Sequence, residues 1–304
     1  PETELTKVTV LLDWLPNTNH TGLYVAKNKG YFSAEGLDVE LMQPGEGGTA
    51  QLIAAGKGDF GISYQEEMTV ARSENIPVVA LAAIIQHNTS GFASPLEKGI
   101  KSPADFEGKT YGGWGSPAET AMLKALMEKY GADFNQVKMV NIGSTDFFNS
   151  MNKGIDFSWI YWGWTGIEAE QRDMKLNFVK LRDENKALDF YTPVIIASEA
   201  ALKDNPELAR KFLRACTKGY EFAIKNPEDA GEILLKNVPD LDKNLVIASQ
   251  KYLADEYKAD APRWGEMNLE TWQNYASFMY ENELIKRNID PQKAFTNQYL
   301  PDNL

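Results

Sequence analysis

The sequence predicts an α/β fold of two lobes, each built on a doubly wound, mostly parallel sheet. Strand and helix patterns alternate from Lys7 to Ile85, and the same alternation restarts at Lys109. The chain of 304 residues is also long for a single hydrophobic core. From Glu199 onward the pattern is almost wholly helical, and we expect these helices to return and cover the first lobe.

The first lobe should contain four strands, which are apolar or alternating runs bounded by turn residues. They are expected at residues 7–14, 37–44, 59–64 and 77–85, with helices between them at 21–30, 50–58 and 66–75. Gly30 is the expected C-terminal cap of the first helix, and Thr49 is the expected N-cap of the second.

The second lobe repeats this order before the helical region begins. Its strands are expected at 109–114, 136–142, 156–161 and 190–198, its helices at 116–131, 145–154 and 165–174, and the later helices at 205–226, 227–238, 241–257 and 269–284. The helix at 116–131 has the clearest start, because Ser116 can be its N-cap, Pro117 takes its first position and Glu119 completes a capping box.

Two crossings of the chain between the lobes follow from this order. We expect them near residues 86–92 and 191–198, so that residues 1–88 plus 197–304 form lobe I and residues 89–196 form lobe II. A cleft between two such lobes is a natural ligand site, and two thin connections would allow hinged closure.

Composition excludes several classes of function. The net charge of -12 argues against nucleic acid and against anionic membrane as partners. The single cysteine, Cys216, permits no intramolecular disulfide and is expected to be a small buried helix residue, and with only His20 and His87 no metal site is expected. No catalytic constellation and no cofactor are expected. No apolar run approaches the ~20 residues of a membrane span, and a signal peptide or lipid anchor would lie upstream.

Aromatic and hydrogen-bonding residues gather at the carboxyl ends of four predicted strands, where doubly wound sheets bind ligands. Four of the 7 tryptophans lie there. From these segments we select as ligand-binding candidates Trp14, Asn17, His20, Tyr64, Trp114, Ser116, Tyr161, Trp164 and Glu168.

The chemistry of these segments favours a flat ligand with N–H donors. They contain no Lys or Arg, which a sulfonate, nitrate or phosphate would usually need, although a helix N-terminus could substitute. Rings stack on Trp and Tyr, and an amino group can donate to a Glu carboxylate. An aminopyrimidine fits this description.

Several candidates have a structural alternative. Tyr161 and Trp162 are adjacent on a strand and point in opposite directions, so at least one should be core. Glu119 is most simply the capping-box partner, whereas Glu168 could serve either the helix start or the ligand. His20 could cap its helix or bind ligand, and these two roles stay open.

Two further features at helix starts give only weak evidence of a functional role. Of Glu66 and Glu67, which open one helix, one should face solvent. The Gly-rich segment at 45–50 lacks the lysine and the spacing of a nucleotide-binding loop and is interpreted as a turn.

The segments "LLDWLPNTNHTGLYVAKNKGYFSAEGLDVEL", "AQLIAAGKGDFGISYQEEMTVAR", "GGWGSPAE" and "YWGWTGIEAE" closely resemble the NMT1/THI5-like family of ABC-transporter solute-binding proteins. The resemblance extends to about Ser198 and implies the two-lobed periplasmic binding protein fold, type II. It is strongest to binding proteins for pyrimidine precursors of thiamine. By that resemblance Trp14 with Tyr161 or Trp164 would sandwich the ring, Glu168 would accept its hydrogens and Asn17 would help to fix it.

The resemblance implies a monomeric extracytoplasmic receptor, periplasmic or lipid-anchored, that delivers its ligand to an ABC permease and its ATPase. The alternatives are a receptor for another solute, such as a riboflavin-like heterocycle or taurine, and an enzyme of pyrimidine biosynthesis. The yeast enzymes of this family carry a cysteine-rich motif, and the lone Cys216 argues against that activity here.

Overall fold

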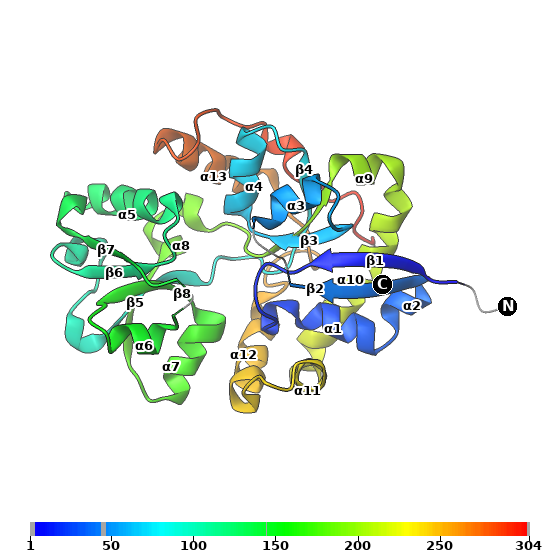
Figure 1. The fold of residues 1–304 in the computed structure, drawn as a ribbon, viewed down its shortest axis with the longest axis horizontal. Coiled ribbons are helices and arrows are strands. Elements are labelled where there is room, and N and C mark those ends of the chain that lie inside the picture. Colours follow the sequence, from blue (N-terminus) through cyan, green and yellow to red (C-terminus); the bar gives the residue numbers. More distant parts are fainter. Residues whose placement is uncertain (1–3, 44–46, 144, 303–304) are drawn as a thin grey trace. The chain divides into compact units, whose positions relative to one another are not determined.

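The computed structural model describes residues 4–43, 47–143 and 145–302. The chain divides into two compact units, each with its own sheet. Unit 1 comprises Pro1–His87, Phe190–Ser277 and Ile285–Leu304, and unit 2 comprises Asn88–Asp189 and Phe278–Leu284. Both units are α/β, as the sequence predicts (Figure 1).

The sheet of unit 1 has five strands in the order β2-β1-β3-β10-β4. Four of them are parallel and β10 is antiparallel to both of its neighbours. The strands are β1 (Thr6–Leu11), β2 (Leu37–Met42), β3 (Phe60–Ser63), β4 (Val78–Ala83) and β10 (Val194–Ser198). The carboxyl ends of the four parallel strands therefore meet at one edge, which carries the loops after β1 and β3.

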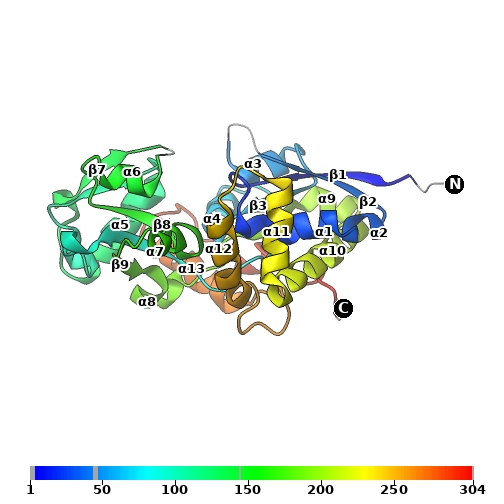
Figure 2. The ribbon, with the colours of Figure 1, turned by 90° about the horizontal axis from the view of Figure 1, so that it is seen from below.

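Helices cover both faces of this sheet. The helices of unit 1 are α1 (Thr21–Asn28), α2 (Tyr31–Ala34), α3 (Thr49–Ala54), α4 (Gln65–Ser73), α9 (Glu199–Asp204), α10 (Pro206–Lys225), α11 (Pro227–Asn237) and α12 (Lys243–Glu256), with short helices at Thr18–His20 and Pro291–Lys293. Helix α13 (Leu269–Glu281) begins in unit 1 and ends in unit 2. Figure 2 shows α1, α10 and α11 packed side by side, so the C-terminal helices do return to the first sheet. Cys216 is fully buried in α10, as predicted.

Helices α1 and α10 approach each other through two glycines. A Cβ on Gly219 would lie 2.0 Å from the carbonyl oxygen of Gly22, and a Cβ on Gly22 would lie 2.3 Å from the ring of Tyr220. Any side chain at position 219 must therefore push the backbones apart.

Gly219→Ala should lower the free energy of unfolding by about 1–3 kcal/mol or more, because the obstacle is backbone and cannot rotate away. Chemical denaturation measures this change. Lys218→Ala, at an exposed position of the same helix, is the control and should change little. Equal effects of the two substitutions would contradict the close approach of the helices.

The sheet of unit 2 has the order β7-β6-β8-β5-β9, in which only β5 is antiparallel to its neighbours. Its strands are β5 (Ser90–Pro95), β6 (Thr110–Gly113), β7 (Lys138–Asn141), β8 (Phe157–Tyr161) and β9 (Leu176–Lys180). Its helices are α5 (Pro117–Lys129), α6 (Phe147–Met151), α7 (Ile167–Gln171) and α8 (Leu181–Glu184), with short helical turns at Leu96–Lys98, Pro103–Phe106, Phe134–Gln136, Trp162–Gly166 and Lys186–Leu188.

The structure corrects the sequence analysis at three places. Strands β5 and β9 were not predicted, and β5 occupies part of the expected first crossing at 86–92. Its sequence, SGFASP, is rich in residues that disfavour strands, and pairing on both sides overrides that preference. Strand β10 was expected at the second crossing, yet it belongs to unit 1, because it pairs with β3 and β4.

The third correction concerns Thr49, which is the first residue of α3 and not its cap. Gly48 takes the N-cap position without a side-chain bond, and the carboxylate of Glu67 accepts from the N–H of Ala50 at 3.2 Å instead. The expected turn at 45–50 lies partly outside the described residues.

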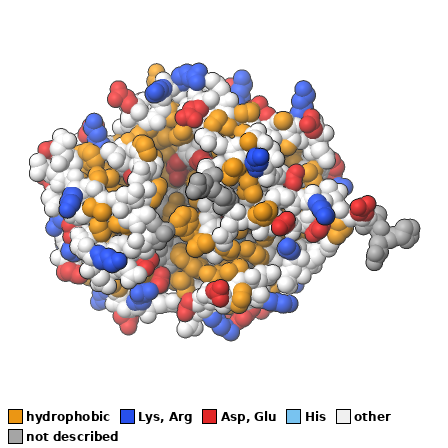
Figure 3. Space-filling view, viewed as in Figure 1, with side chains coloured by type: hydrophobic (Ala, Val, Ile, Leu, Met, Phe, Trp, Pro, Cys, Tyr) orange, Lys and Arg blue, Asp and Glu red, His pale blue; other side chains and the backbone are white. Residues whose placement is uncertain are grey.

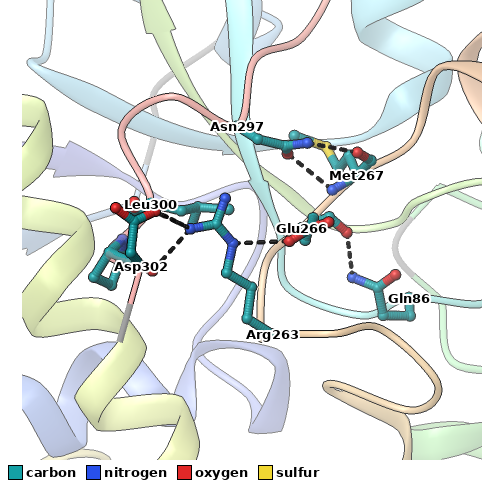
Figure 4. A network of polar contacts seen from close by, with 8 residues as sticks. Gln86, Arg263, Glu266, Met267, Asn297, Leu300 and Asp302 are labelled. Atoms are coloured by element: carbon teal, nitrogen blue, oxygen red, sulfur yellow. Dashed lines mark hydrogen bonds and ion pairs between the residues drawn. The ribbon is translucent and has the colours of Figure 1, made fainter. Parts of the chain in front are cut away.

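The C-terminal segment is fastened to the edge of the first sheet. Ala80 of β4 donates to Ala294 and accepts from Thr296, and Asn297 exchanges two hydrogen bonds with the backbone of Met267. Arg263 bonds to Glu266 at 2.8 Å (Figure 4). It also donates to the carbonyl oxygen of Pro301 at 2.9 Å. These contacts cover the edge of β4, which would otherwise expose unpaired backbone groups.

Three further features concern surface charge, the hydropathy of the helices and metal-ligating side chains. On the face drawn in Figure 3, acidic and basic side chains are interspersed and not gathered by sign. Of the helices in the described part of the chain, none has the length and apolar character to span a bilayer. Within those same residues, His, Cys, Asp and Glu form no group of three that could hold a metal ion.

Candidate functional site

The loop after β1 is organised around the carboxylate of Asp13. His20 Nε2 lies 2.6 Å from Asp13 Oδ1, and the hydroxyl of Tyr64 donates to Asp13 Oδ2 at 2.7 Å. The carboxylate is only 5% exposed and His20 is fully buried. Asp13 therefore ties the loop after β1 to the loop after β3, which lie at the same edge of the sheet.

The role of His20, left open by the sequence, is structural. Its Nδ1 accepts from the backbone N–H of Asn17 at 3.2 Å, so the ring proton sits on Nε2 and is donated to Asp13. Asn17 in turn accepts from the N–H of Asn19 and donates to the carbonyl of Leu15. The Asn17–His20 capping box thus shapes the loop, and a buried His20 offers no ring atom to a ligand.

Trp14 is the aromatic side chain that this loop presents to solvent. It is 56% exposed, and the adjacent Leu15 is 59% exposed. An aromatic ring left this open has few core contacts to lose, and its face is available for stacking.

Helix α4 begins directly after β3 and carries two adjacent carboxyl groups with different surroundings. Glu67 accepts from the hydroxyl of Ser63 and from the N–H of Ala50. Glu66 Oε1 is buried and has no hydrogen-bond partner. Burial raises the pKa of both groups, and it raises that of Glu66 to about 8. The expectation that one of them faces solvent is therefore wrong, because both residues are partly buried and neither is exposed.

Gln65 anchors the same loop from the inside. Its side chain accepts from the N–H of Tyr191 at 2.8 Å and donates to the carbonyl of Thr271 at 3.2 Å, while its own N–H bonds to the carbonyl of Tyr191 at 3.1 Å. The backbone that carries Tyr64 and Glu66 is thereby held rigidly next to the segment that leads into β10.

In unit 2, the loop after β6 is built on Glu119. This buried carboxylate accepts from the backbone N–H groups of Trp114 and Ser116 and from the hydroxyl of Tyr111 at 2.5 Å. Ser116 accepts from Ala118, which completes the predicted capping box. Glu119 is thus structural, as the sequence favoured, and it positions the turn that carries Trp114.

Trp114 is the exposed aromatic residue of this loop. It is 50% exposed, and its ring centroid lies 5.5 Å from that of Trp159 on β8. Ser116, at the start of α5, is partly buried and uses its hydroxyl as a helix cap. Each unit therefore presents one half-exposed tryptophan on the loop that follows the second strand of its five-stranded sheet.

The aromatic side chains at the end of β8 and in the turn after it are all partly buried. Trp162 packs against Phe178 with ring centroids 5.0 Å apart and lies over Gly166, where a Cβ would clash with the indole at 2.3 Å. Tyr161 and Trp164 are partly buried. The prediction that at least one of the adjacent pair Tyr161 and Trp162 is core does not hold in full, because both residues are partly buried and neither is fully enclosed.

Glu168 already has a cationic partner within the protein. Arg172, one turn further along, approaches Glu168 Oε1 with its Nη2 at 2.6 Å and lies 4.0 Å from the ring centroid of Phe148. The sequence analysis counted cations only in the four strand-end segments and missed Arg172. Its i,i+4 spacing from Glu168 is the signal that could have found the pair.

The selected residues fall into two groups, one in each unit. In unit 1, His20 and Tyr64 bond to Asp13, Asn17 bonds to His20, and Trp14 is exposed beside them. In unit 2, Trp114 and Ser116 follow β6, whereas the segment with Tyr161, Trp164 and Glu168 lies at and after the end of β8, which pairs with β6 in parallel. Asp13 and Glu66 were not selected, although both follow strand ends. Only the structure distinguishes a carboxyl group that is bonded within the protein from one that is not.

Comparison with known proteins identifies the family. The family model described as "NMT1/THI5 like" matches residues 17–230. The chain belongs to this family. The match covers the loops after β1, β3, β6 and β8 from Asn17 onward, so both groups of candidate residues lie almost wholly within the matched part.

Two relatives of this NMT1/THI5-like protein differ in function. A formylaminopyrimidine-binding protein of Halalkalibacterium halodurans is 28% identical over 306 residues, covering 96% of this chain and 90% of that protein. A 4-amino-5-hydroxymethyl-2-methylpyrimidine phosphate synthase of Legionella pneumophila is 26% identical over 307 residues, covering 97% and 93% respectively.

A solved structure with the same fold is the periplasmic aliphatic sulphonate binding protein SsuA from Escherichia coli. It has a TM-score of 0.72 at 15% identity and covers 94% of this chain and 91% of that one. The NMT1/THI5-like chain therefore has the periplasmic binding protein fold that the sequence predicts, with two mixed sheets and flanking helices.

Proposed function

We propose that this protein is the extracytoplasmic receptor of an ABC importer and that it binds a small aminopyrimidine. The observation that carries the proposal is the pair of half-exposed tryptophans, Trp14 and Trp114, each at the ligand-binding edge of its own sheet. The formylaminopyrimidine-binding relative supports the choice of ligand.

The chemistry of the two loops supports a flat ring with hydrogen-bond donors. Trp14 and Trp114 offer ring faces, and a stack on each contributes about 0.5–1.5 kcal/mol beyond the area that it buries. Tyr64, Tyr161 and Trp164 are proposed to extend the aromatic surface. Asn17 and Ser116 are proposed to act through the shape of their loops, since their side chains bond to the backbone.

Glu168 remains a proposed ligand contact, with one condition. Its carboxylate would have to share its charge between Arg172 and the ligand's amino group, because Oε1 already accepts from the guanidinium at 2.6 Å. A carboxylate has lone pairs for more than one donor, so both bonds can coexist.

The proposed mechanism is differential affinity. The ligand would contact both units only in a closed form and so shift the population towards it, after which a permease with its ATPase would accept the loaded receptor. The chain crosses between the units at His87–Asn88 and Asp189–Phe190, and it crosses twice more at Ser277–Phe278 and Leu284–Ile285. At the first two crossings, Asn88 bonds to Asp189 and to the carbonyl of Leu188 within unit 2. We propose that the two connections joined by Asn88 move together as a hinge. We also propose that the receptor works as a monomer.

Calorimetric titration tests this function with four ligands: hydroxymethylpyrimidine, its formyl-aminomethyl analogue, riboflavin and taurine. We expect tight binding of at least one pyrimidine and no heat with taurine. The protein should first be unfolded and refolded to remove any co-purified ligand. Binding of riboflavin or taurine in place of the pyrimidines would replace the proposed ligand while keeping the receptor role.

A pyrimidine-forming enzyme is the second candidate, because a relative of 26% identity is named as a synthase. The single cysteine of this chain, Cys216, argues against this candidate. It is buried in α10, and this burial raises the pKa of its thiol. An enzyme would release a pyrimidine product under turnover conditions, and mass spectrometry would detect it. A receptor would return its ligand unchanged.

A further inference from the structure

We infer that Glu66 is the specificity-determining residue of the site and that, as the neutral acid, it pairs with the edge of an aminopyrimidine. Its O–H would donate to a ring nitrogen while its other oxygen accepts from the exocyclic amino group. The inference rests on the proposed function and deepens it, because it names the group that selects the ligand.

In the described loops after β1 and β3 and the first turn of α4, three carboxyl groups lie at the carboxyl edge of the unit 1 sheet. Two of them are bonded within the protein. Asp13 accepts from His20 and Tyr64. Glu67 accepts from Ser63 and Ala50. Glu66 is different, because its Oε1 is buried and lacks any hydrogen-bond partner. Buried polar atoms are rarely left unpaired, so an atom of this kind calls for an external partner.

The rest of the loop holds Glu66 in place for such a role. It is the second residue of α4, directly after Gln65, whose side chain is bonded to Tyr191 and Thr271. On the other side, Tyr64 is bonded to Asp13 in the loop that carries the exposed Trp14. The side chain with the unpartnered oxygen therefore extends from a preorganised segment of backbone at the ligand-binding edge.

The electrostatic surroundings keep the proton on this carboxyl group. Burial raises the pKa of Glu66 to about 8 against the lowering effect of a hydrogen bond with its own backbone, and the charge of the adjacent Glu67 adds to the increase. The charge of Asp13 also contributes to raising the pKa of Glu67. The Asp13 carboxylate itself accepts from His20 and Tyr64. At pH 7 the acid form of Glu66 is the major one.

The acid form matches one edge of an aminopyrimidine. A neutral carboxyl group has one donor and one acceptor side by side, and an amino group next to a ring nitrogen has the complementary pair. A carboxylate would instead present two acceptors and would face the lone pair of the ring nitrogen. A sulfonate carries only acceptors and could use the O–H alone, so Glu66 would select against it.

The pairing predicts how affinity depends on pH. Below pH 8 the free protein already holds the required proton, so affinity should be constant near neutrality. Above pH 8 the proton must be taken up on binding, and affinity should fall by up to about tenfold for each pH unit. The aminopyrimidine does not lose a proton in this interval, so the change would report on the protein.

The test is calorimetric titration with hydroxymethylpyrimidine at pH 7 and pH 9 on four proteins. The wild type should bind about tenfold more weakly at pH 9. Glu66→Gln should keep most of the pH 7 affinity and lose the pH dependence, because an amide also offers one donor and one acceptor. Glu66→Ala should lose about tenfold or more at pH 7. Glu74→Gln, at the exposed end of the same helix, should behave as the wild type.

The outcomes separate this inference from the proposed function. Wild-type binding with equal affinity at both pH values, or full affinity of Glu66→Ala, would overturn the role of Glu66 and leave the receptor intact. Failure of the wild type to bind any aminopyrimidine would overturn both. Circular dichroism at both pH values verifies that each variant is folded. If Glu66→Gln keeps the pH 7 affinity that Glu66→Ala loses, the difference reports on hydrogen bonding to the ligand, which a purely structural role would not give.

Discussion

Replacing Trp14 and Trp114 together with alanine should weaken binding of an aminopyrimidine about a hundredfold or more. Each ring is proposed to stack on one face of the ligand, and loss of ~1.4 kcal/mol from each corresponds to about tenfold in the dissociation constant. The residues lie in different units, so their effects should multiply. The two single variants and the double variant should be measured by calorimetry.

The fold should survive this double substitution. Trp14 is 56% exposed and Trp114 is 50% exposed, so little core packing is lost apart from the contact of Trp114 with Trp159. Leu96→Ala is the matched control, since Leu96 is 47% exposed but follows β5, whose antiparallel direction puts it at the opposite edge of the same sheet. Unchanged affinity in the double variant would remove both tryptophans from the site.

Asp13→Ala should lower the free energy of unfolding by about 2–4 kcal/mol. The substitution removes the acceptor of the buried His20 Nε2–H and of the Tyr64 hydroxyl, and an unpaired buried donor costs about 1–3 kcal/mol. Affinity should fall as well, because the loops that carry Trp14 and Glu66 lose their connection. Denaturant unfolding followed by fluorescence measures the first effect, and calorimetry measures the second.

Two control substitutions make the Asp13 result interpretable. Asp38→Ala removes an exposed carboxylate from β2 and should change the stability by less than about 0.5 kcal/mol. Asp13→Asn keeps one acceptor oxygen and should be less harmful than alanine. If Asp13→Ala were as mild as Asp38→Ala, the carboxylate would not organise the two loops.

The fold class followed from the sequence because local signals agree with the tertiary structure. The capping box at Ser116 and Glu119 and the alternating strands of unit 1 carry their own information. Strands β5 and β9 escaped prediction because their pairing decides their conformation. SGFASP has little intrinsic preference for a strand, yet β5 pairs with β8 on one side and β9 on the other.

For the site as well, the sequence determined some features and only the tertiary structure decided others. By itself the sequence determined that aromatic and acidic residues follow the strands and that the strand-end segments contain no cation, since position along the chain fixes which residues reach the carboxyl edge. It could not determine which of these groups are already bonded. His20 and Glu119 serve the protein, Glu168 is shared with Arg172, and Glu66 keeps an unpartnered oxygen, because hydrogen bonding and burial depend on neighbours brought together only by folding.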